Sequence, residues 1–268
     1  MGKVIAVCTS DRKGIQKKDV STAHFSAEWG IDGDAHAGKW HRQISLLSAD
    51  KIEAFNKRGA NVIPGAFGEN LVVEGFDFRA LPVGTLLRCN DVLLEMTQIG
   101  KECHSHCEIY KKMGDCIMPR EGVFARVLEP GTISVGDEMT IVPREGHFPW
   151  QAAVITLGES WSGETISKRL RDVGYTVVEE PAIPDDARVL KQQLIRLCDQ
   201  RRLDLILVTG GAGSAAQEAM SAVSDKPTPG IASAVIRGKT LIAADPEEHM
   251  DALMDSAPQV MESLRNGR

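Results

Sequence analysis

The sequence predicts an α/β protein with a β-rich, barrel-like N-terminal domain and a C-terminal three-layer αβα domain whose sheet is mostly parallel. Two observations carry this prediction. Up to about residue 142, short apolar runs alternate with Gly, Pro, Asn and Asp turns, as in barrels and folded sheets. After about residue 150, apolar runs alternate with amphipathic stretches of helical period, as in parallel sheets covered by helices.

The N-terminal half is expected to hold seven strands and two helices. The strands are residues 4–8, 43–47, 71–73, 85–89, 92–97, 123–128 and 138–142. One helix is expected over residues 49–57, because Ser48 before it is a residue type that commonly caps helices. The other is expected over residues 104–112.

Residues 143–150 have two prolines, a glycine and no apolar periodicity, so they are predicted to link a domain at 1–142 to a domain at 151–268. In the second domain the expected strands are residues 152–157, 175–178, 204–208 and 239–243, and the expected helices are 162–173, 185–200 and 247–264. The first of these helices is predicted to bury Ile166, Leu170 and Val173 and to end at Gly174.

Composition excludes several classes of protein. At 268 residues the chain can form two domains, and 43% hydrophobic with 25% charged residues is typical of a globular protein. The formal net charge of −6 argues against non-specific binding to nucleic acid or an anionic membrane. No apolar run approaches the length of a membrane span, and the N-terminus lacks the apolar core of a signal peptide. We therefore expect a cytoplasmic protein with reduced thiols.

Three of the six cysteines lie in one short segment, K-E-C-H-S-H-C-E-I-Y-K-K-M-G-D-C. Thiolates are soft metal ligands and the nucleophiles of sulfur transfer, so Cys103, Cys107 and Cys116 are the candidate catalytic residues. If residues 104–112 are helical, Cys103 and Cys107 share one face and can act on one centre.

Three interpretations of this cysteine segment stay open. Cys107 and Cys116 can be resolving or persulfide-relay partners of Cys103. The three thiolates can instead bind zinc with His104 or His106, although C-x3-C-x8-C lacks the usual C-x2-C knuckle. One or two of the cysteines can also be ordinary buried residues. The remaining three lie in apolar runs and are expected in the core: Cys8, Cys89 and Cys198.

The segment T-G-G-A-G, residues 209–213, follows an apolar strand and precedes a helix. Gly210, Gly211 and Gly213 there let backbone N–H groups approach an anion, and the helix N-terminus adds a favourable dipole. A tight turn without a ligand uses the same residues. Together with V-I-T-L-G-E-S, S-G-E-T-I-S-K-R-L, I-P-D-D and G-K-T-L-I-A-A-D-P, the segment resembles the molybdopterin-binding family that includes molybdopterin adenylyltransferase, over about residues 150–266.

This resemblance implies the fold and the binding of a pterin or phosphate, but the chain departs from the family's pattern. T-G-G-A-G stands for the usual T-G-G-T-G, and the loop that carries an aspartate in the family is cut to E-S-W-S-G. Adenylyl transfer needs carboxylates that hold Mg²⁺. The only acids expected near these loops are Glu159, Glu164 and Glu218, and none stands at a matching position. The resemblance therefore implies a shortened, degenerate domain.

Two polar turns in the N-terminal half supply further candidates. The segment G-I-D-G-D-A-H-A-G-K-W-H-R holds Asp34, His36 and Arg42, and P-G-A-F-G-E-N-L places Glu69 and Asn70 before a strand. Turns use Asp, Asn and Gly for their own geometry. A group of acids, histidines and arginine is more than a turn needs, so we expect it to bind an anion or to order a neighbouring cysteine loop.

These turns, with K-G-I-Q-K, R-Q-I-S-L-L, V-G-T-L-L-R, L-E-M-T-Q-I-G-K-E-C and G-V-F-A-R-V-L-E-P-G-T-I-S-V-G-D, resemble the MOSC domain over about residues 2–142. MOSC domains occur at the C-terminus of molybdenum cofactor sulfurases and in stand-alone bacterial proteins. The family's characteristic cysteine maps to Cys103, which implies that this thiolate coordinates the molybdenum or receives sulfur. The residues of the family's cofactor cleft carry over to this chain as Lys17, Arg42, Asn70 and Arg126.

The chain also departs from the MOSC pattern at the cysteines. Glu102 precedes Cys103 where most MOSC domains have proline, and Cys107 and Cys116 are additions that the resemblance does not predict.

The resemblances together imply a cytoplasmic protein of molybdenum cofactor biosynthesis or maturation. It would bind molybdopterin carrying molybdenum or tungsten, or transfer sulfur through Cys103. Its partners would be molybdopterin or a precursor, a persulfide-donating sulfurase or a molybdoenzyme acceptor, and a second copy of the chain.

Three alternatives or associations stand beside this hypothesis. One is a molybdenum-dependent reductase of N-hydroxylated bases, which needs electrons from a partner because the chain has no flavin or iron–sulfur motif. A different class is a zinc-stabilised, non-catalytic scaffold or a metal-trafficking protein. The family is also associated with pyridoxal phosphate, although no lysine here stands in a context that demands a Schiff base.

Overall fold

The structure is a computed structural model that describes residues 1–101, 103, 107–142, 150–211, 213–228, 231, 233–244 and 246–265. It divides into two compact units, Met1–Glu145 and Gly146–Arg268. Apart from Trp150, the predicted linker lies outside the described residues, so the boundaries 1–142 and 151–268 stay predictions.

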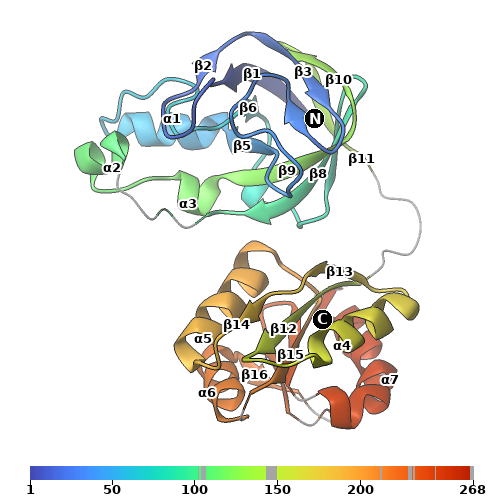
Figure 1. Cartoon of the computed structure of the whole chain (residues 1–268). Coiled ribbons are helices and arrows are strands. Elements are labelled where there is room, and N and C mark those ends of the chain that lie inside the picture. The colour runs from blue at the N-terminus through green and yellow to red at the C-terminus, as the bar shows by residue number, and fades with distance from the viewer. Residues whose placement is uncertain are drawn as a thin grey trace. The chain divides into compact units, whose positions relative to one another are not determined.

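The N-terminal unit is built on a β-barrel (Figure 1). Within the described residues, seven strands run in the order β11-β7-β8-β9-β5-β6-β1, and pairing of β1 with β11 closes the ring. Their bounds are β1 Gly2–Thr9, β5 Ile44–Ser48, β6 Leu71–Glu74, β7 Leu86–Cys89, β8 Val92–Ile99, β9 Val123–Glu129 and β11 Glu138–Val142. Each predicted strand of this half corresponds to one of them, so the predicted barrel is confirmed.

Four short strands of this unit were not predicted: β2 Lys18–Asp19, β3 Thr22–Ser26, β4 Gly30–Ile31 and β10 Gly131–Ser134. β10, β3 and β4 form a separate antiparallel sheet, and β2 pairs with the end of β1. The longest, β3, reads T-A-H-F-S and buries only Phe25. Its alternation of polar and apolar residues places Ala23 and Phe25 on one face, against the barrel core, which is a strand signal that the prediction missed.

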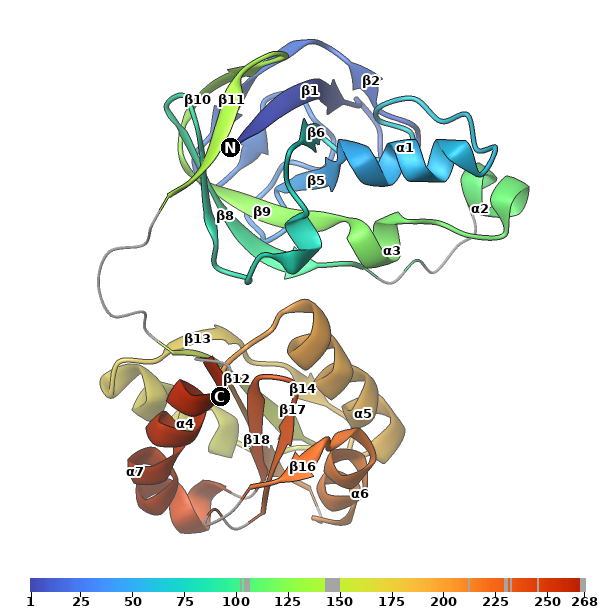
Figure 2. The ribbon, with the colours of Figure 1, turned by 180° about the vertical axis from the view of Figure 1, so that it is seen from behind.

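Apolar residues of this unit form two clusters on opposite sides of the barrel wall. β1 contributes to both, with Val4 and Val7 in the barrel interior and Ala6 and Cys8 in an outer cluster. The outer cluster packs against α1 (Ala49–Lys57), which runs along the barrel in Figure 2. We call it the outer cluster; it includes Leu47, Ile52, Phe55, Phe67, Cys116, Ile117, Met118 and Phe124.

The helices of this unit partly match the prediction. α1 has the predicted bounds, but the Ser48 hydroxyl makes no cap and instead accepts a hydrogen bond from the Phe78 N–H, at the start of the short 3-10 helix Phe78–Ala80. The remaining helices are α2 (Glu108–Met113) and α3 (Met118–Glu121). The start of the predicted helix 104–112 falls on residues outside the described part. Cys107 precedes α2 in an extended conformation, φ −73° and ψ 173°. The prediction that Cys103 and Cys107 share one face of a helix is therefore wrong.

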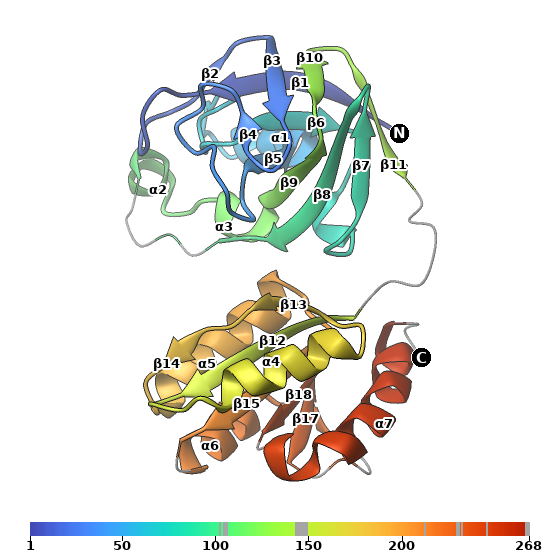
Figure 3. The same ribbon diagram turned by 45° about the vertical axis from the view of Figure 1, so that its right-hand side comes forward.

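The C-terminal unit is a three-layer αβα structure (Figure 3). Its sheet has the order β13-β12-β15-β18-β17-β16, and β14 also pairs with β12. The pairs among β13, β14, β12, β15 and β18 are parallel, whereas β17 and β16 add antiparallel pairs at one edge. The strands are β12 Gln151–Leu157, β13 Thr176–Glu179, β14 Ala182–Ile183, β15 Leu205–Gly210, β16 Lys226–Pro227, β17 Ala234–Arg237 and β18 Thr240–Ala244.

Helices cover both faces of this sheet. α4 (Ser162–Asp172) and α7 (Pro246–Arg265) pack on one face, and α5 (Ala187–Ile195) with α6 (Ser214–Val223) packs on the other. A π-helical turn, Arg196–Gln200, extends α5. β12 alternates accordingly, since Ala152 and Val154 face the first layer while Ala153 and Ile155 face the second. The predicted three-layer domain is therefore confirmed.

The prediction that Val173 is buried was wrong. Val173 is exposed because α4 ends before it, at Asp172, and Gly174 follows with a φ of +91°. No helix within the described part of the chain is long and apolar enough to cross a membrane.

Candidate functional site

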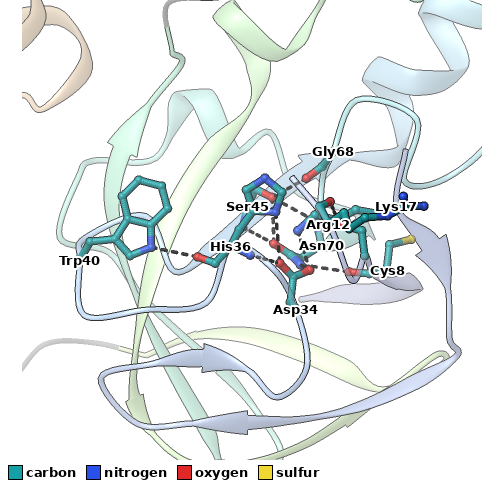
Figure 4. A network of polar contacts seen from close by, with 10 residues as sticks. Cys8, Arg12, Lys17, Asp34, His36, Trp40, Ser45, Gly68 and Asn70 are labelled. Atoms are coloured by element: carbon teal, nitrogen blue, oxygen red, sulfur yellow. Dashed lines mark hydrogen bonds and ion pairs between the residues drawn. The ribbon is translucent and has the colours of Figure 1, made fainter. Parts of the chain in front are cut away.

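The structure brings four predicted site residues of the N-terminal unit together in a buried polar network (Figure 4). Lys17 Nζ donates to Asp34 Oδ2 at 2.8 Å, and both side chains are almost completely buried. Asn70 Nδ2 donates to the same carboxylate oxygen at 2.9 Å and to the Cys8 carbonyl at 3.0 Å. The backbone N–H of His36 donates to Asp34 Oδ1 at 2.7 Å. The network therefore ties the polar turn to β1 and to the start of β6.

Burial and hydrogen bonding set the charges in this network. Burial alone would raise the pKa of Asp34, but hydrogen bonds from His36 and Lys17 outweigh it and hold that pKa well below its usual range. Burial lowers the pKa of Lys17, and the hydrogen bond to Asp34 opposes part of that shift. In this conformation the Lys17 ammonium donates to Asp34 and helps to hold the turn that carries it. A contact between Lys17 and a phosphate stays a prediction.

Glu69 lies beside this network and was only partly anticipated by the sequence. Its carboxylate accepts hydrogen bonds from the backbone N–H groups of Gly65 at 2.7 Å and Phe67 at 2.9 Å. Burial nevertheless raises the pKa of Glu69 to about 7. The sequence showed an acid before a strand, but not that the preceding loop closes over it.

Arg42 joins the network through an aromatic side chain. Its guanidinium carbon lies 4.8 Å from the Trp40 ring centroid and 5.5 Å from that of Phe124. Such stacking attracts the cation to the rings and fixes its plane. Trp40 Nε1 donates to the His36 carbonyl at 3.0 Å, which connects this stack to Asp34. Trp40 was not among the predicted site residues, although its place two residues before Arg42 was visible in the sequence.

Arg126 lies outside this network and is oriented by two acidic side chains, Glu95 and Glu28. Its Nε donates to Glu95 Oε2 at 2.6 Å across the β8–β9 pair, and its Nη1 lies 4.0 Å from Glu28. The Arg126 side chain is 41% exposed, whereas that of Glu95 is 6% exposed. Its guanidinium is thus oriented from one side and open to solvent on the other.

The structure separates the three clustered cysteines into two kinds. Cys103 and Cys107 are exposed, whereas Cys116 is buried in the outer cluster. Burial raises the pKa of the Cys116 thiol to about 11, and charges on Cys107 and Cys103 add to this effect. The other three cysteines are buried, as predicted, and burial raises each of their pKa values to about 12: Cys8, Cys89 and Cys198.

The region of the chain that the structure describes contains no group of three His, Cys, Asp or Glu side chains placed to hold a metal ion. His104 and His106, which the zinc interpretation requires, lie outside the described residues.

In the C-terminal unit the glycine loop lies at the carboxyl end of β15, as predicted. Gly210, Gly211 and Gly213 have φ values of +79°, +75° and +79°, a conformation that favours glycine. A Cβ on Gly211 would lie 2.7 Å from Asp185 Oδ1, whereas one on Gly213 would meet no atom of the described residues within 4 Å. One side of the loop is therefore packed and its end is open.

Asp185 corrects the expectation that only three glutamates lie near this loop. It stands in the I-P-D-D segment just after β14, and its carboxylate lies against Gly211. The signal in the sequence was the parallel sheet itself, because the carboxyl ends of parallel strands meet at one edge. β14 and β15 both pair with β12 in parallel, so the residues that follow them converge.

A chain of hydroxyl groups borders the same loop. Ser160 Oγ lies 2.7 Å from Ser162 Oγ, which lies 2.9 Å from Thr209 Oγ1. Trp161 stands between the two serines and is 88% exposed. An exposed indole beside a row of hydroxyls offers an aromatic surface and polar groups to one ligand.

Comparison with known families and structures adds to this geometry. Residues 33–140 match the MOSC domain family, and residues 131–241 match the family described as "Probable molybdopterin binding domain". The residues shared by the two matches, 131–140, belong to the N-terminal unit, where they form β10 and part of β11.

Solved structures similar to each unit have also been found. The YuaD protein from Bacillus subtilis is 22% identical, with a TM-score of 0.45, over 52% of this chain and 94% of its own. YiiM from Geobacillus stearothermophilus is 19% identical, with a TM-score of 0.43, over 54% of this chain and 76% of its own. The molybdopterin biosynthesis Mog protein from Mycobacterium ulcerans is 18% identical, with a TM-score of 0.40, over 45% of this chain and 99% of its own. By the two family matches, this chain joins a MOSC domain to a domain of the molybdopterin-binding family.

Proposed function

We propose that this protein acts in the maturation of the molybdenum cofactor, in the cytoplasm, with Cys103 as the residue that binds the metal or carries sulfur to it. The two domain families support a role related to this cofactor. The observation that carries the finer proposal is the exposure of Cys103. Of the six cysteines, only Cys103 and Cys107 are exposed, and only Cys103 stands where the MOSC resemblance implies a functional thiolate.

The residues of the N-terminal unit fit a molybdenum-bearing pterin in part. The Cys103 thiolate is a soft donor of the kind that molybdenum accepts. Arg42, stacked on Trp40, and Arg126, oriented by Glu95, would hold the anionic phosphate of the pterin. Bound molybdenum would supply two-electron redox chemistry.

Lys17, Asp34 and Asn70 support this cleft from within. They hydrogen-bond to one another and to the backbone around them, so they fix the turn that carries His36 and, through Trp40, the plane of Arg42. We assign them a positioning role, because the Lys17 ammonium is buried and already donates to Asp34, so it would have to move to reach a phosphate.

The C-terminal unit would bind the pterin or its precursor at the glycine loop. The open end of the loop at Gly213 and the N-terminus of α6 suit an anionic group. The hydroxyls of Ser160, Ser162 and Thr209 would orient it, and Trp161 would cover an aromatic ring. Because one chain carries two domains of these families, we propose that the pterin passes from one domain to the other.

The metal and pterin content of the isolated protein tests this proposal. We expect the full chain, purified anaerobically from cells that make the cofactor, to contain molybdenum or tungsten together with pterin. Cys103→Ser should lose most of the metal, because the soft donor is gone. Cys107→Ser is the matched control, since it removes an exposed thiol four residues away, and it should keep the metal.

Other results of the same analysis would support other functions. Stoichiometric zinc without molybdenum, tungsten or pterin would contradict the proposal and favour a zinc-stabilised scaffold. Metal retained equally by the wild type and Cys103→Ser would contradict the assignment of Cys103 as the ligand. Cofactor-loaded protein that reduces N-hydroxylated bases when given electrons would favour the reductase.

A further inference from the structure

Asp34 and His36 form a carboxylate–histidine pair at the edge of the buried network (Figure 4). Nδ1 of His36 lies 3.2 Å from Asp34 Oδ1, and the backbone N–H of the same histidine donates to that oxygen at 2.7 Å. An ionised carboxylate can only accept hydrogen bonds, so Nδ1 carries a proton and is the donor. One carboxylate oxygen thus holds both the backbone and the ring of His36, which fixes the direction of the ring.

The Asp34 carboxylate is supported from its other side. Lys17 Nζ and Asn70 Nδ2 donate to Oδ2 at 2.8 Å and 2.9 Å, and the Asp34 side chain is only 2% exposed. Burial opposes the charge of Asp34, but these donors and His36 outweigh burial and keep the carboxylate ionised. The Lys17 ammonium also balances that charge. Asp34 can therefore orient His36 without presenting an unpaired negative charge to a ligand.

The second ring nitrogen of His36 is available to a ligand. The His36 side chain is 32% exposed, and among the described residues its Nε2 has no hydrogen-bond partner. A neutral imidazole with its proton on Nδ1 presents a lone pair at Nε2, whereas an imidazolium donates from both nitrogens. As an imidazolium, His36 can bind an anion through Nε2–H while Nδ1–H stays on Asp34.

Arg42 supplies a second cation beside this pair. Trp40 Nε1 donates to the His36 carbonyl at 3.0 Å, and the guanidinium carbon of Arg42 lies 4.8 Å from the Trp40 ring centroid. Trp40 thus contacts both residues and holds the two basic side chains on one turn. A phosphate group has several terminal oxygens, so a guanidinium and an imidazolium can bind it together.

Other charged groups near His36 come from the segments that pack around its turn. The loop after β1 lies beside the turn, because the Ala35 N–H donates to the Ser10 carbonyl at 2.8 Å, and in that loop Arg12 Nε lies 3.8 Å from Asp11 Oδ1. The charged groups of these segments and of the turn itself include Asp11, Arg12, Lys17, Asp32, Asp34, Lys39, Arg42 and Glu69. Within the described residues, Asp34 is the acid that bonds to the ring.

We propose that His36, held by Asp34, binds the terminal phosphate of the pterin as an imidazolium, together with Arg42, and takes up a proton as it does so. This inference rests on the proposed binding of the pterin by the N-terminal unit. The proton comes from the solvent and binds to Nε2, and no covalent bond to the phosphate forms. The proposal makes binding of the phosphate depend on pH and assigns that dependence to one histidine.

Binding of hydroxymethylpterin phosphate to the full chain tests this inference. Isothermal titration calorimetry in buffers of different ionisation enthalpy gives both the affinity and the number of protons taken up. We expect the wild type to take up about half a proton per bound phosphate at about pH 7.5, since an imidazole titrates near neutral pH. His36→Gln should take up none and bind about 10-fold more weakly, because it lacks a charge-assisted hydrogen bond to the phosphate.

Matched controls separate this role from a general effect of losing a histidine. His24→Gln removes an exposed histidine of β3 whose Nδ1 lies 3.5 Å from the Thr132 hydroxyl instead of a carboxylate, and it should behave as the wild type. Far-ultraviolet circular dichroism should be the same for His36→Gln and the wild type, and His36→Asn serves if glutamine disturbs the turn. Inorganic phosphate should bind more weakly than the pterin ester. Equal affinities would overturn the assignment to the phosphate of the pterin.

Arg42→Met separates the failure of this inference from the failure of the proposed function. Weaker binding by Arg42→Met, with wild-type affinity and proton uptake in His36→Gln, overturns the role of His36 and leaves pterin binding by the N-terminal unit intact. Weaker binding by His36→Gln with unchanged proton uptake overturns the proton linkage. Wild-type binding in both variants, or no binding by the wild type, overturns pterin binding by the N-terminal unit and this inference with it.

Discussion

At the scale of single residues, burial decides what each charged group of the N-terminal unit can do. Motifs alone made Lys17, Asp34, His36 and Asn70 candidate binding residues. The structure shows them hydrogen-bonded in one buried network. Their proximity could not be predicted from pattern, because it depends on the return of three distant segments to one point in the barrel.

Removal of the Lys17 charge should destabilise the N-terminal unit. Lys17→Met leaves the Asp34 carboxylate buried without its cation, and we expect a loss of about 3 kcal/mol in unfolding free energy. Lys51→Met is the control, because Lys51 pairs with Asp77 and Glu121 at the surface and should contribute about 1 kcal/mol or less. Urea unfolding of both variants checks this, and equal losses would contradict the role given to the network.

Glu69 should make the stability of the same unit depend on pH. Burial raises its pKa from 4.5 to about 7 in the folded protein, so folding takes up a proton between these values. The contribution of Glu69 to stability therefore falls as pH rises from 4.5 to about 7 and is level above that. The difference corresponds to roughly 3 kcal/mol.

The comparison with Glu69→Gln isolates this effect. The wild type should lose stability relative to the variant as pH rises through this window, as measured by urea midpoints at several pH values. Parallel curves for the two proteins would show that Glu69 does not titrate in the window.

At the scale of elements, strands that bury several residues were predicted more often than strands that bury only one. Six of the seven predicted barrel strands bury two or more residues, whereas β3 and β10 bury only one each and were missed. β11, which buries only Met139, is the exception, because its apolar run is visible in the sequence. The expected helix at residues 104–112 showed the same limit, since α2 buries none of its residues and begins only at Glu108. The position of Asp185 followed from the pairing of β14 with β12, which no local pattern reveals.

The glycine loop after β15 allows a matched pair of substitutions. Gly213→Ala should meet only the strain of a positive φ, about 1 kcal/mol, because no atom in the described part of the chain lies within 4 Å of its Cβ position. Gly211→Ala adds a clash with the Asp185 carboxylate to the same strain, so it should destabilise the C-terminal unit more. Thermal unfolding of the two variants measures the difference. Equal effects would contradict the close packing of Asp185 on this loop.

At the scale of the whole molecule, the chain joins two domains whose families both concern the molybdenum cofactor. The N-terminal domain offers an exposed soft thiol and two oriented arginines, and the C-terminal domain offers an open glycine loop bordered by hydroxyls and an exposed indole. The sequence predicted both domains through their motifs. It could not separate the three clustered cysteines, because their burial is a property of tertiary packing.

The central claim is that Cys103 binds the metal of the cofactor or carries sulfur to it. Its most direct test is anaerobic titration of the full chain with molybdenum cofactor released from a molybdoenzyme, followed by gel filtration and molybdenum analysis of the protein peak. We predict that molybdenum elutes with the wild type and with Cys107→Ser, and that Cys103→Ser retains much less. Molybdenum that elutes free of the wild-type protein, or equally with Cys103→Ser, would contradict the claim.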